Sequence, residues 1–168
     1  GPLIYRKSIL QSVGFDKVPE DHAGILDLSR KLQKAGKPAG FALGNAKGDG
    51  NGFANWVLWS HNAALLNEEG DVVINSKETV AALNWVKEIY PTFIAGTPSW
   101  NDVSNNRAYS SQEISLTANG VSLYFSLKND PATKAIADDS EHQLLPKGLA
   151  KVSPMAGLTL NAMLFKHS

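Results

Sequence analysis

A glycine-rich loop carries the polar side chains whose chemistry is most evident in this sequence. Residues 41–63 read FALGNAKGDGNGFANWVLWSHNA and place Asn45, Asp49 and Asn51 between a short apolar run and a segment with two tryptophans. Side-chain amides and carboxylates form hydrogen bonds with hydroxyl groups, which are costly to bury without partners. Asn and Asp residues in such loops also stabilise turns. The loop is therefore either a ligand-binding loop or a structural turn.

A second polar group follows the apolar run ISLTA at residues 114–118. Asn119 and Gly120 place a side-chain amide next to the start of a helical stretch. The free backbone N–H groups at a helix N-terminus bind anions and other acceptors. We therefore expect this strand end to contribute to the capture of a hydroxyl group or an anion.

The four tryptophans divide into two groups by their surroundings in the sequence. A flat aromatic face can cover the apolar side of a small molecule, but a tryptophan is also a frequent core residue. Trp100 lies in an irregular segment and Trp56 lies on the first helical turn after the glycine-rich loop, so both are candidates for stacking on a ligand. We interpret Trp59 and Trp85 as core residues.

Motifs that need a fixed spacing do not fit this chain. The sequence GDGNG at residues 48–52 lacks the Lys-Ser/Thr pair of a phosphate-binding loop. Asp49-Gly-Asn51 resembles the beginning of a calcium loop, but position twelve is Ser60 where that loop has glutamate. Metal-ligand spacing is also missing from the four histidines, which are His22, His61, His142 and His167. We expect no metal, no cofactor and no catalytic triad.

Composition narrows the classes of partner. The chain has 168 residues, which suits one domain, and its 16 basic and 16 acidic residues cancel without forming a basic cluster. A nucleic-acid partner is therefore not expected. The absence of cysteine excludes disulfides and a cysteine nucleophile but leaves the compartment open. No stretch has the length of a signal peptide or the roughly 20 apolar residues of a membrane span.

Hydrophobic periodicity predicts alternating strands and helices. The expected strands are 3–5, 40–43, 114–118, 143–145 and 157–165, and the expected helices are 7–13, 21–35, 53–66, 76–90 and 103–110, with another helical stretch opened by Gly120. The helix 76–90 begins at Ser76, and its apolar stripe consists of Val80, Leu83, Val86 and Tyr90. This alternation predicts an open α/β sheet flanked by helices, which binds ligands at the carboxyl ends of its strands.

Three segments, in this order, resemble the bacterial extracellular solute-binding proteins of ABC importers, specifically the sugar-binding family 1 group. LIYRKSILQSVGFDKVPED at 3–21 is similar to the point where those proteins cross into their second lobe. NDVSNNRAYSSQEISLTANG at 101–120 is similar to their acceptor-rich strand that ends in a small polar residue and glycine. LLPKGLAKVSPMAGLTLNAMLFKHS at 144–168 is similar to their return toward the first lobe.

The resemblance implies a periplasmic-binding-protein-like (type II) fold. Residues 1–168 would form a single domain, the second lobe of a two-lobed receptor, without the first lobe and the C-terminal helices. The implied function is the solute-binding component of an ABC importer, which is not an enzyme. Its ligand would be a sugar or a related polyhydroxylated small molecule held in the interlobe cleft, its partner an ABC permease, and its location the periplasm or the extracellular surface.

The candidate ligand-binding residues come from the two polar groups, the stacking candidates and the resemblance. Gly157 matches the glycine that begins the family's return strand, where the backbone approaches the ligand. The complete set is Asn45, Asp49, Asn51, Trp56, Trp100, Asn119, Gly120 and Gly157.

Two alternatives to the binding function remain open, and one property of an isolated lobe follows from its geometry. A glycoside-acting enzyme needs two carboxylates across a sugar subsite, for which Asp49 and Asp102 are the pair we can nominate. The other alternative is a folded fragment without binding activity.

An isolated lobe would expose strand edges, so we expect a homo-oligomer formed through the terminal strands at 3–5 and 160–165.

Overall fold

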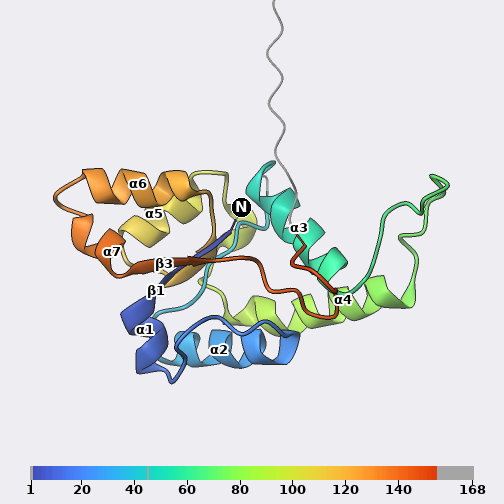
Figure 1. The fold of residues 1–168 in the computed structure, drawn as a ribbon, viewed down its shortest axis with the longest axis horizontal. Helices are drawn as coiled ribbons and strands as arrows, with labels where there is room; N and C mark the ends of the chain where they lie inside the picture. The colour runs from blue at the N-terminus through green and yellow to red at the C-terminus, as the bar shows by residue number, and fades with distance from the viewer. Residues whose placement is uncertain (1, 45, 155–168) are drawn as a thin grey trace, which may run out of the picture.

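The computed structural model describes residues 2–44 and 46–154, so the expected strand at 157–165 lies outside the described residues. The fold combines a small sheet with helices on both of its faces (Figure 1). The elements in chain order are β1 (Leu3–Arg6), α1 (Lys7–Ser12), α2 (His22–Lys34), α3 (Asp49–Ser60), α4 (Lys77–Ile89), the 3₁₀ helices η1 (Tyr90–Thr92) and η2 (Thr97–Ser99), α5 (Ser104–Ser110), β2 (Leu116–Ala118), α6 (Val121–Asn129), α7 (Lys134–Asp138) and β3 (Ser140–Gln143).

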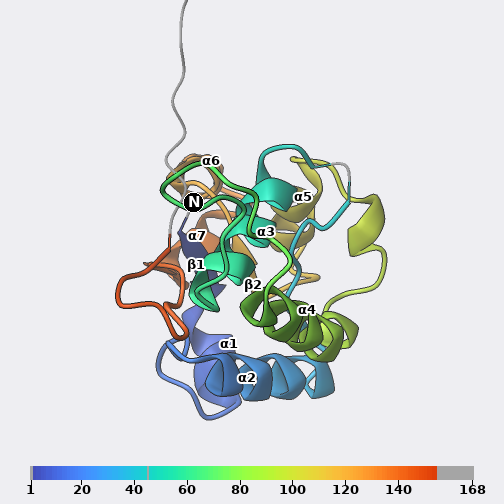
Figure 2. The same cartoon turned by 90° about the vertical axis from the view of Figure 1, so that its right-hand side faces the viewer.

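The sheet has the order β2-β1-β3, and β1 pairs antiparallel with both neighbours. Because successive side chains of a strand point to opposite faces, Leu3 and Tyr5 pack into a core with α2, α3 and α4. Ile4 packs into a second core with α5, α6 and α7. Figures 1 and 2 show α1 and α2 on one side of the sheet and α5 and α6 on the other. The predicted α/β sheet flanked by helices is therefore confirmed.

The central position of β1 changes the expectation about self-association. Leu3 pairs with Ala118 on one side and with Gln143 on the other. Residues 3–5 are therefore not a free strand edge, and the expectation that they expose an edge for a homo-oligomer is wrong. Residues 160–165 lie outside the described residues, so self-association through them stays a prediction.

The expected strand at 40–43 is absent from the structure. Ala39 forms isolated parallel bridges with Leu116 and with Phe93, and the N–H of Gly40 donates to the carbonyl oxygen of Leu116. Further along, the N–H of Leu43 donates to the Thr97 carbonyl, 3.3 Å away. The segment thus changes its hydrogen-bond partner along its length, from Leu116 of β2 to Thr97. It therefore forms no continuous ladder.

Helix α3 begins four residues earlier than predicted and ends at Ser60. Asp102, which lies far away in the sequence, accepts hydrogen bonds from the backbone N–H groups of Gly48 (3.0 Å) and Asp49 (2.9 Å). A side-chain acceptor of this kind satisfies N–H groups that lack partners within the helix. The second half of the glycine-rich loop is consequently the first turn of a helix.

Helix α4 has the predicted N-cap but buries a different face. The Ser76 hydroxyl accepts from the N–H of Thr79, as the sequence indicates. The buried residues are Thr79, Ala82, Trp85 and Ile89, whereas Val80 and Leu83 of the predicted stripe are 55% and 57% exposed. The Trp85 indole donates to the backbone carbonyl of His22, 3.1 Å away, and this contact turns its side of the helix toward α2.

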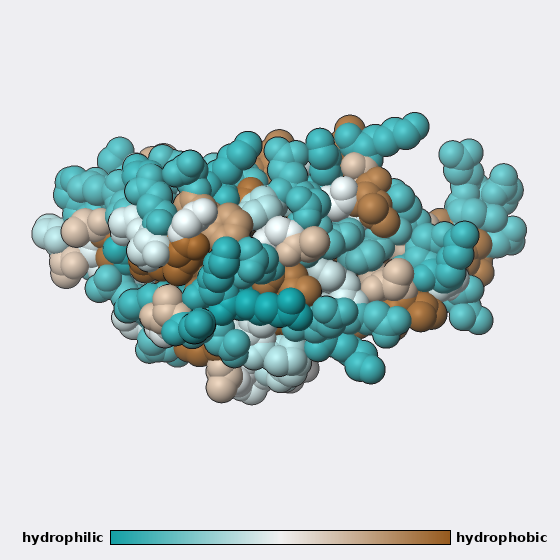
Figure 3. All heavy atoms as spheres, turned by 90° about the horizontal axis from the view of Figure 1, so that it is seen from below, coloured by the Kyte–Doolittle hydropathy of each residue, from teal (hydrophilic) through white to brown (hydrophobic). Residues whose placement is uncertain are grey.

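The outer surface formed by α1 and α2 is mostly hydrophilic, with hydrophobic residues in small separate patches (Figure 3). Helix α2 contributes to this, because its apolar Ile25, Leu28 and Leu32 are buried. Within the described part of the chain, no helix is long and apolar enough to cross a membrane.

Candidate functional site

A small recess lies where the first turns of α3 meet the end of β2. Its wall combines helix residues with residues from two distant segments, in the order Gly48, Asp49, Gly52, Phe53, Trp56, Ala118, Leu145 and Pro154. Asp49 is the charged side chain of this wall, and most of the others are apolar. The recess therefore offers one acceptor group against an apolar surface.

Asp49 opens helix α3 and is held by a neutral partner. Its Oδ2 accepts a hydrogen bond from the Asn105 side-chain amide, 2.8 Å away. Burial raises the pKa of the Asp49 carboxyl, the hydrogen bond from Asn105 lowers it, and the charge of Asp102 raises it. The net direction is upward, but a carboxylate can still accept further hydrogen bonds at this position.

Asn51 does not line the recess, although it lies on the same helix. Its side chain is exposed, and its amide donates to the backbone carbonyl of Lys47, 2.7 Å away. This is the turn-stabilising role that the sequence left open for the Asn and Asp residues of the loop. Asn45 lies outside the described residues.

Trp56 is a wall residue of the recess and a core residue at the same time. Its side chain is 2% exposed, and its indole N–H donates to the carbonyl oxygen of Pro146, 2.7 Å away. The ring packs edge-to-face against Trp85 and Phe53 and stacks at a centroid distance of 6.1 Å on Phe41. Protein groups thus occupy its faces, which leaves it no free platform for stacking on a ligand.

We expect Trp56→Phe to lower the free energy of unfolding by about 1.5 kcal/mol, because it removes the indole donor and leaves the Pro146 carbonyl without that partner. Urea denaturation at pH 7 measures the change. Trp59→Phe is the matched control, since Trp59 lies on the same helix and is only partly buried. Equal losses in the two variants would contradict the structural role assigned to the Trp56 indole.

Trp100 does not belong to the wall of the recess. It is partly buried and packs against the core formed by α5, α6 and α7. Gly40 provides the space for it, because a Cβ atom at Gly40 would lie 2.6 Å from Cη2 of Trp100. Trp85 is buried as predicted, whereas Trp59 is only partly buried.

Asn119 and Gly120 directly follow Ala118, which lines the recess. The Asn119 side chain is 8% exposed, and its amide donates to Oδ1 of Asn106. Its backbone N–H donates to the carbonyl oxygen of Pro2, 2.9 Å away. Gly120 is the N-cap residue of α6. The structure thus brings the end of β2 and the start of α3 to the same recess, and Gly157 lies outside the described residues.

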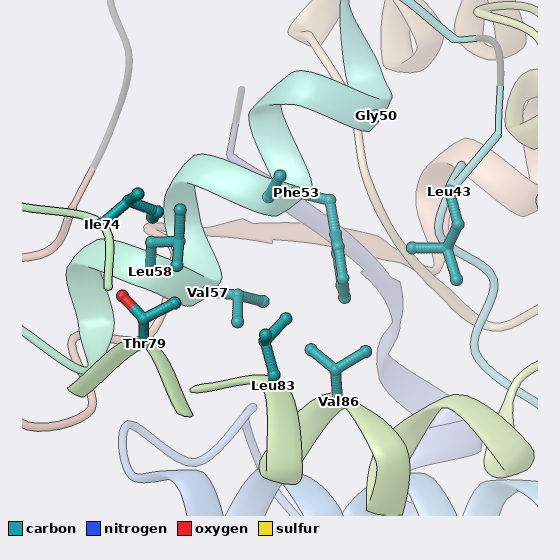
Figure 4. A pocket seen from close by; sticks show the side chains of 10 residues that line it. Leu43, Gly50, Phe53, Val57, Leu58, Ile74, Thr79, Leu83 and Val86 are labelled. Carbon is teal, nitrogen blue, oxygen red and sulfur yellow. The ribbon is translucent and has the colours of Figure 1, made fainter. Parts of the chain in front are cut away.

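A larger hollow of about 460 Å³ lies between α3 and α4 (Figure 4). Val57 and Leu58 of α3 face Leu83 and Val86 of α4 across it, and Thr79 is its one polar side chain. Hydroxyl groups would find almost no partners there, which makes their burial costly. The smaller recess at Asp49 is therefore the better candidate for a polar ligand.

Three residues that the sequence did not single out as binding residues hold the recess together. Asp102 caps α3, Asn105 bonds Asp49, and Asn106 bonds Asn119. The segment SNN at 104–106 gave no signal beyond its polarity, because its partners are more than ten residues away. Among the residues that the structure describes, no group of three or more His, Asp or Glu side chains could hold a metal ion.

Comparison with known proteins places the chain in a family. A model of the bacterial extracellular solute-binding proteins matches residues 1–162. A putative ABC transporter periplasmic-binding protein of Escherichia coli (strain K12), YcjN, is 28% identical over 106 residues, which is 61% of this chain and 24% of that protein.

Solved structures share the fold. Maltose-bound MalE3 of T. maritima matches with a TM-score of 0.75 and 26% identity over 88% of this chain and 38% of its own. A sugar transporter of Arthrobacter chlorophenolicus A6 with bound laminaribiose matches with a TM-score of 0.71 and 19% identity, covering 88% of this chain and 36% of its own. A solute-binding protein of Agrobacterium vitis S4 with bound D-mannitol matches with a TM-score of 0.69 and 17% identity, covering 86% and 36%.

The chain thus spans less than two fifths of these structures and about a quarter of the curated relative. The match of the family model extends from the first residue to residue 162, well beyond half of the chain. The chain therefore belongs to the family of bacterial extracellular solute-binding proteins.

Proposed function

We propose that this chain is the second lobe of a two-lobed receptor and forms one wall of a site for a sugar or a related polyhydroxylated small molecule. The receptor would act at the periplasmic or extracellular side and deliver its ligand to an ABC permease. The observation that carries the proposal is the recess itself, where Asp49 at the start of α3 faces the end of β2. The neighbours with bound maltose, laminaribiose and D-mannitol support this ligand class.

The recess supplies the two kinds of contact that such a ligand needs. The Asp49 carboxylate is an acceptor for hydroxyl groups, and Asn105 keeps it oriented. Phe53, Leu145 and Pro154 give an apolar wall for the C–H side of the molecule. The other half of the contacts would come from a facing lobe, which agrees with the small share of the related chains that this chain covers.

The glycosidase alternative is disfavoured by the position of Asp102. Its Oδ1 accepts from two backbone N–H groups at the start of α3, the helix that Asp49 opens. The two acidic residues therefore meet at one helix end, whereas a hydrolytic pair flanks the scissile bond from two sides. Release of chromophore from a chromogenic glycoside, abolished by Asp49→Asn, would overturn the binding function.

We expect this chain alone to bind maltose with a dissociation constant of about 1 mM or weaker. A two-lobed receptor with about micromolar affinity has a binding free energy of about −8 kcal/mol, and half of that corresponds to about 1 mM. Hinge closure buries a ligand from both sides, so one lobe keeps only part of the contacts. Isothermal titration calorimetry and NMR titration with maltose and D-mannitol measure the affinity.

The controls separate a site at Asp49 from nonspecific sugar contacts. Asp49→Asn is expected to weaken maltose binding, measured by the NMR shifts at the recess, at least threefold, which corresponds to about 0.6 kcal/mol or more. Asp27→Asn on α2 changes an aspartate whose ion-pair partner is Lys31, and it is expected to leave these shifts unchanged. Micromolar binding by the single chain, or equal effects of both variants, would contradict the proposal.

A further inference from the structure

We propose that Asn105 is a positioning residue of the candidate site, which fixes the Asp49 carboxylate against the end of β2. The inference rests on the proposed function of the recess. Asn105 is 0% exposed, and its Nδ2 lies 2.8 Å from Oδ2 of Asp49 and 3.1 Å from the carbonyl oxygen of Ala118. One buried amide thus bridges two residues that line the recess from different elements.

The chemistry of this bridge requires an amide. The Nδ2 group of asparagine has two hydrogens, and both have acceptors here. The Oδ1 atom accepts from the backbone N–H of Asn106, 2.9 Å away. An aspartate would lack the donors and a leucine would lack both donor and acceptor, and unpaired buried polar groups are costly. The position is therefore specified by its partners and not by packing alone.

The neighbouring Asn106 extends the arrangement to Asn119, which follows the wall residue Ala118. Its Oδ1 accepts from the side-chain amide of Asn119. Two adjacent residues of α5 therefore hold both polar groups that the sequence indicates. Asn105 bonds Asp49 of the glycine-rich loop, and Asn106 bonds Asn119 after β2. Groups that are fixed before a ligand arrives lose less conformational entropy on binding.

The hydrogen bond from Asn105 also affects the pKa of the Asp49 carboxyl, which packing alone does not. A hydrogen bond to the ionised form of a carboxyl favours that form and lowers its pKa. Burial and the charge of Asp102 both act in the opposite direction on Asp49. Loss of the Asn105 amide removes the opposing contribution, so the Asp49 carboxyl should hold its proton to a higher pH.

The test is an NMR titration of side-chain carboxyl carbons in the 168-residue chain, which needs no ligand. The Asp49 signal is assigned by its loss in Asp49→Asn. We expect Asn105→Leu to raise the Asp49 midpoint by at least about half a pH unit. Asn105→Ser, which keeps one hydroxyl donor, is expected to restore part of the shift. It also provides a variant that removes less of the network if Asn105→Leu does not fold.

Asn106→Leu is the matched control on the same helix, because Asn106 bonds Asn119 and not Asp49. It is expected to leave the Asp49 midpoint unchanged while it shifts the side-chain amide signal of Asn119. An unchanged Asp49 midpoint in a folded Asn105 variant would overturn the positioning role. Addition of 50 mM maltose, roughly fifty times the expected dissociation constant, tests the proposed function separately. If the Asp49 signal of the wild-type chain does not respond to maltose, the proposed function is contradicted. The effect of Asn105 on the Asp49 titration would still stand.

Discussion

Acidification from pH 7 to pH 4.5 is expected to lower the free energy of unfolding by about 2 kcal/mol, because two histidine rings are stacked inside the fold. The rings of His22 and His61 lie 3.7 Å apart at an angle of 7°, and both lie against Trp85. Nε2 of His22 is 3.0 Å from the Ser60 hydroxyl, and the His61 side chain is 5% exposed. Two cations at this distance would repel each other in a site with little water.

The direction of this change in stability follows from the pKa values of the two histidines. Burial, and after it the charge of His61, lower the pKa of His22 from its ordinary value of 6.5 to about 4, with Asp21 acting in the opposite direction. Burial also lowers the pKa of His61. Between about pH 6.5 and pH 4 the unfolded chain therefore binds more protons than the folded chain, so stability falls as the pH falls through this window. Each pKa unit corresponds to about 1.4 kcal/mol.

Two carboxyl groups also affect how stability changes with pH near this pH range. The pKa of Asp139 is lowered by its bonds to Ser8 and Arg6, so its contribution is lost mainly below the ordinary aspartate pKa of 3.8. The raised pKa of Asp49 acts in the opposite direction to the histidines, since the folded state gains protons there. Between pH 7 and pH 4.5 the stacked histidines and His142, whose pKa burial also lowers, reduce stability on acidification, and Asp49 offsets part of this loss.

Urea denaturation at several pH values measures the effect. His22→Phe keeps an aromatic ring against His61 and is expected to remove most of the pH dependence. His142→Phe is the comparison, because His142 lies apart from the pair, on β3 against Tyr124. Burial also lowers the pKa of His142, so its replacement is expected to remove a smaller part of the pH dependence than His22→Phe. A wild-type free energy of unfolding that stays constant from pH 6.5 to pH 4.5 would show that the pair does not titrate in this way.

The second large effect is expected for Gly44→Ala, with a loss of about 3 kcal/mol or more in the free energy of unfolding. A Cβ atom at Gly44 would lie 1.6 Å from the carbonyl oxygen of Pro98 and 2.5 Å from its carbon. Both obstacles are backbone atoms, so no side-chain rotation relieves the overlap. The glycine-rich segment and η2 would have to separate, which would also disturb the neighbouring recess.

Gly52→Ala is the matched control eight residues away. Gly52 lies within α3, and an added Cβ atom there meets nothing within 4 Å. Alanine is favoured over glycine in a helix by up to about 1 kcal/mol, so this variant is expected to be neutral or more stable. The two alanine variants should therefore change the midpoint of urea denaturation in different directions. A loss below about 1 kcal/mol in Gly44→Ala would disprove the close approach.

The sequence predicted correctly the elements whose determinants are local. The helix α2 has its cap and its apolar spacing within one segment, and the Ser76 cap of α4 bonds Thr79 in the first turn of the same helix. The start of α3 was missed because its cap comes from Asp102, and the face of α4 was missed because Trp85 bonds α2. These contacts join residues more than fifty positions apart.

In the candidate site, too, the sequence indicates residue types but not the contacts between distant segments. Asp49 and Asn119 were nominated by type and by their position after an apolar run, and their role in ligand binding stays a prediction. The structure places Asp49 and Ala118, the residue before Asn119, in the wall of one recess. Trp56 was expected to stack on a ligand, but its hydrogen bond to Pro146 depends on a segment ninety residues away. Asn105 and Asn106 have roles that follow only from partners brought together by the fold.

The hydrogen bonds from the start of α3 to Asp102 also affect how this part of the protein opens locally. The first turn of α3 is bonded to a side chain that lies just after η2 and just before α5, so neither segment can open without the other losing partners. Local opening in proteins occurs in contiguous cooperative units, which amide hydrogen exchange detects. The amides of Gly48 and Asp49 should therefore exchange in step with the segment at 102–105. A ligand held by Asp49 would then also slow hydrogen exchange in α5.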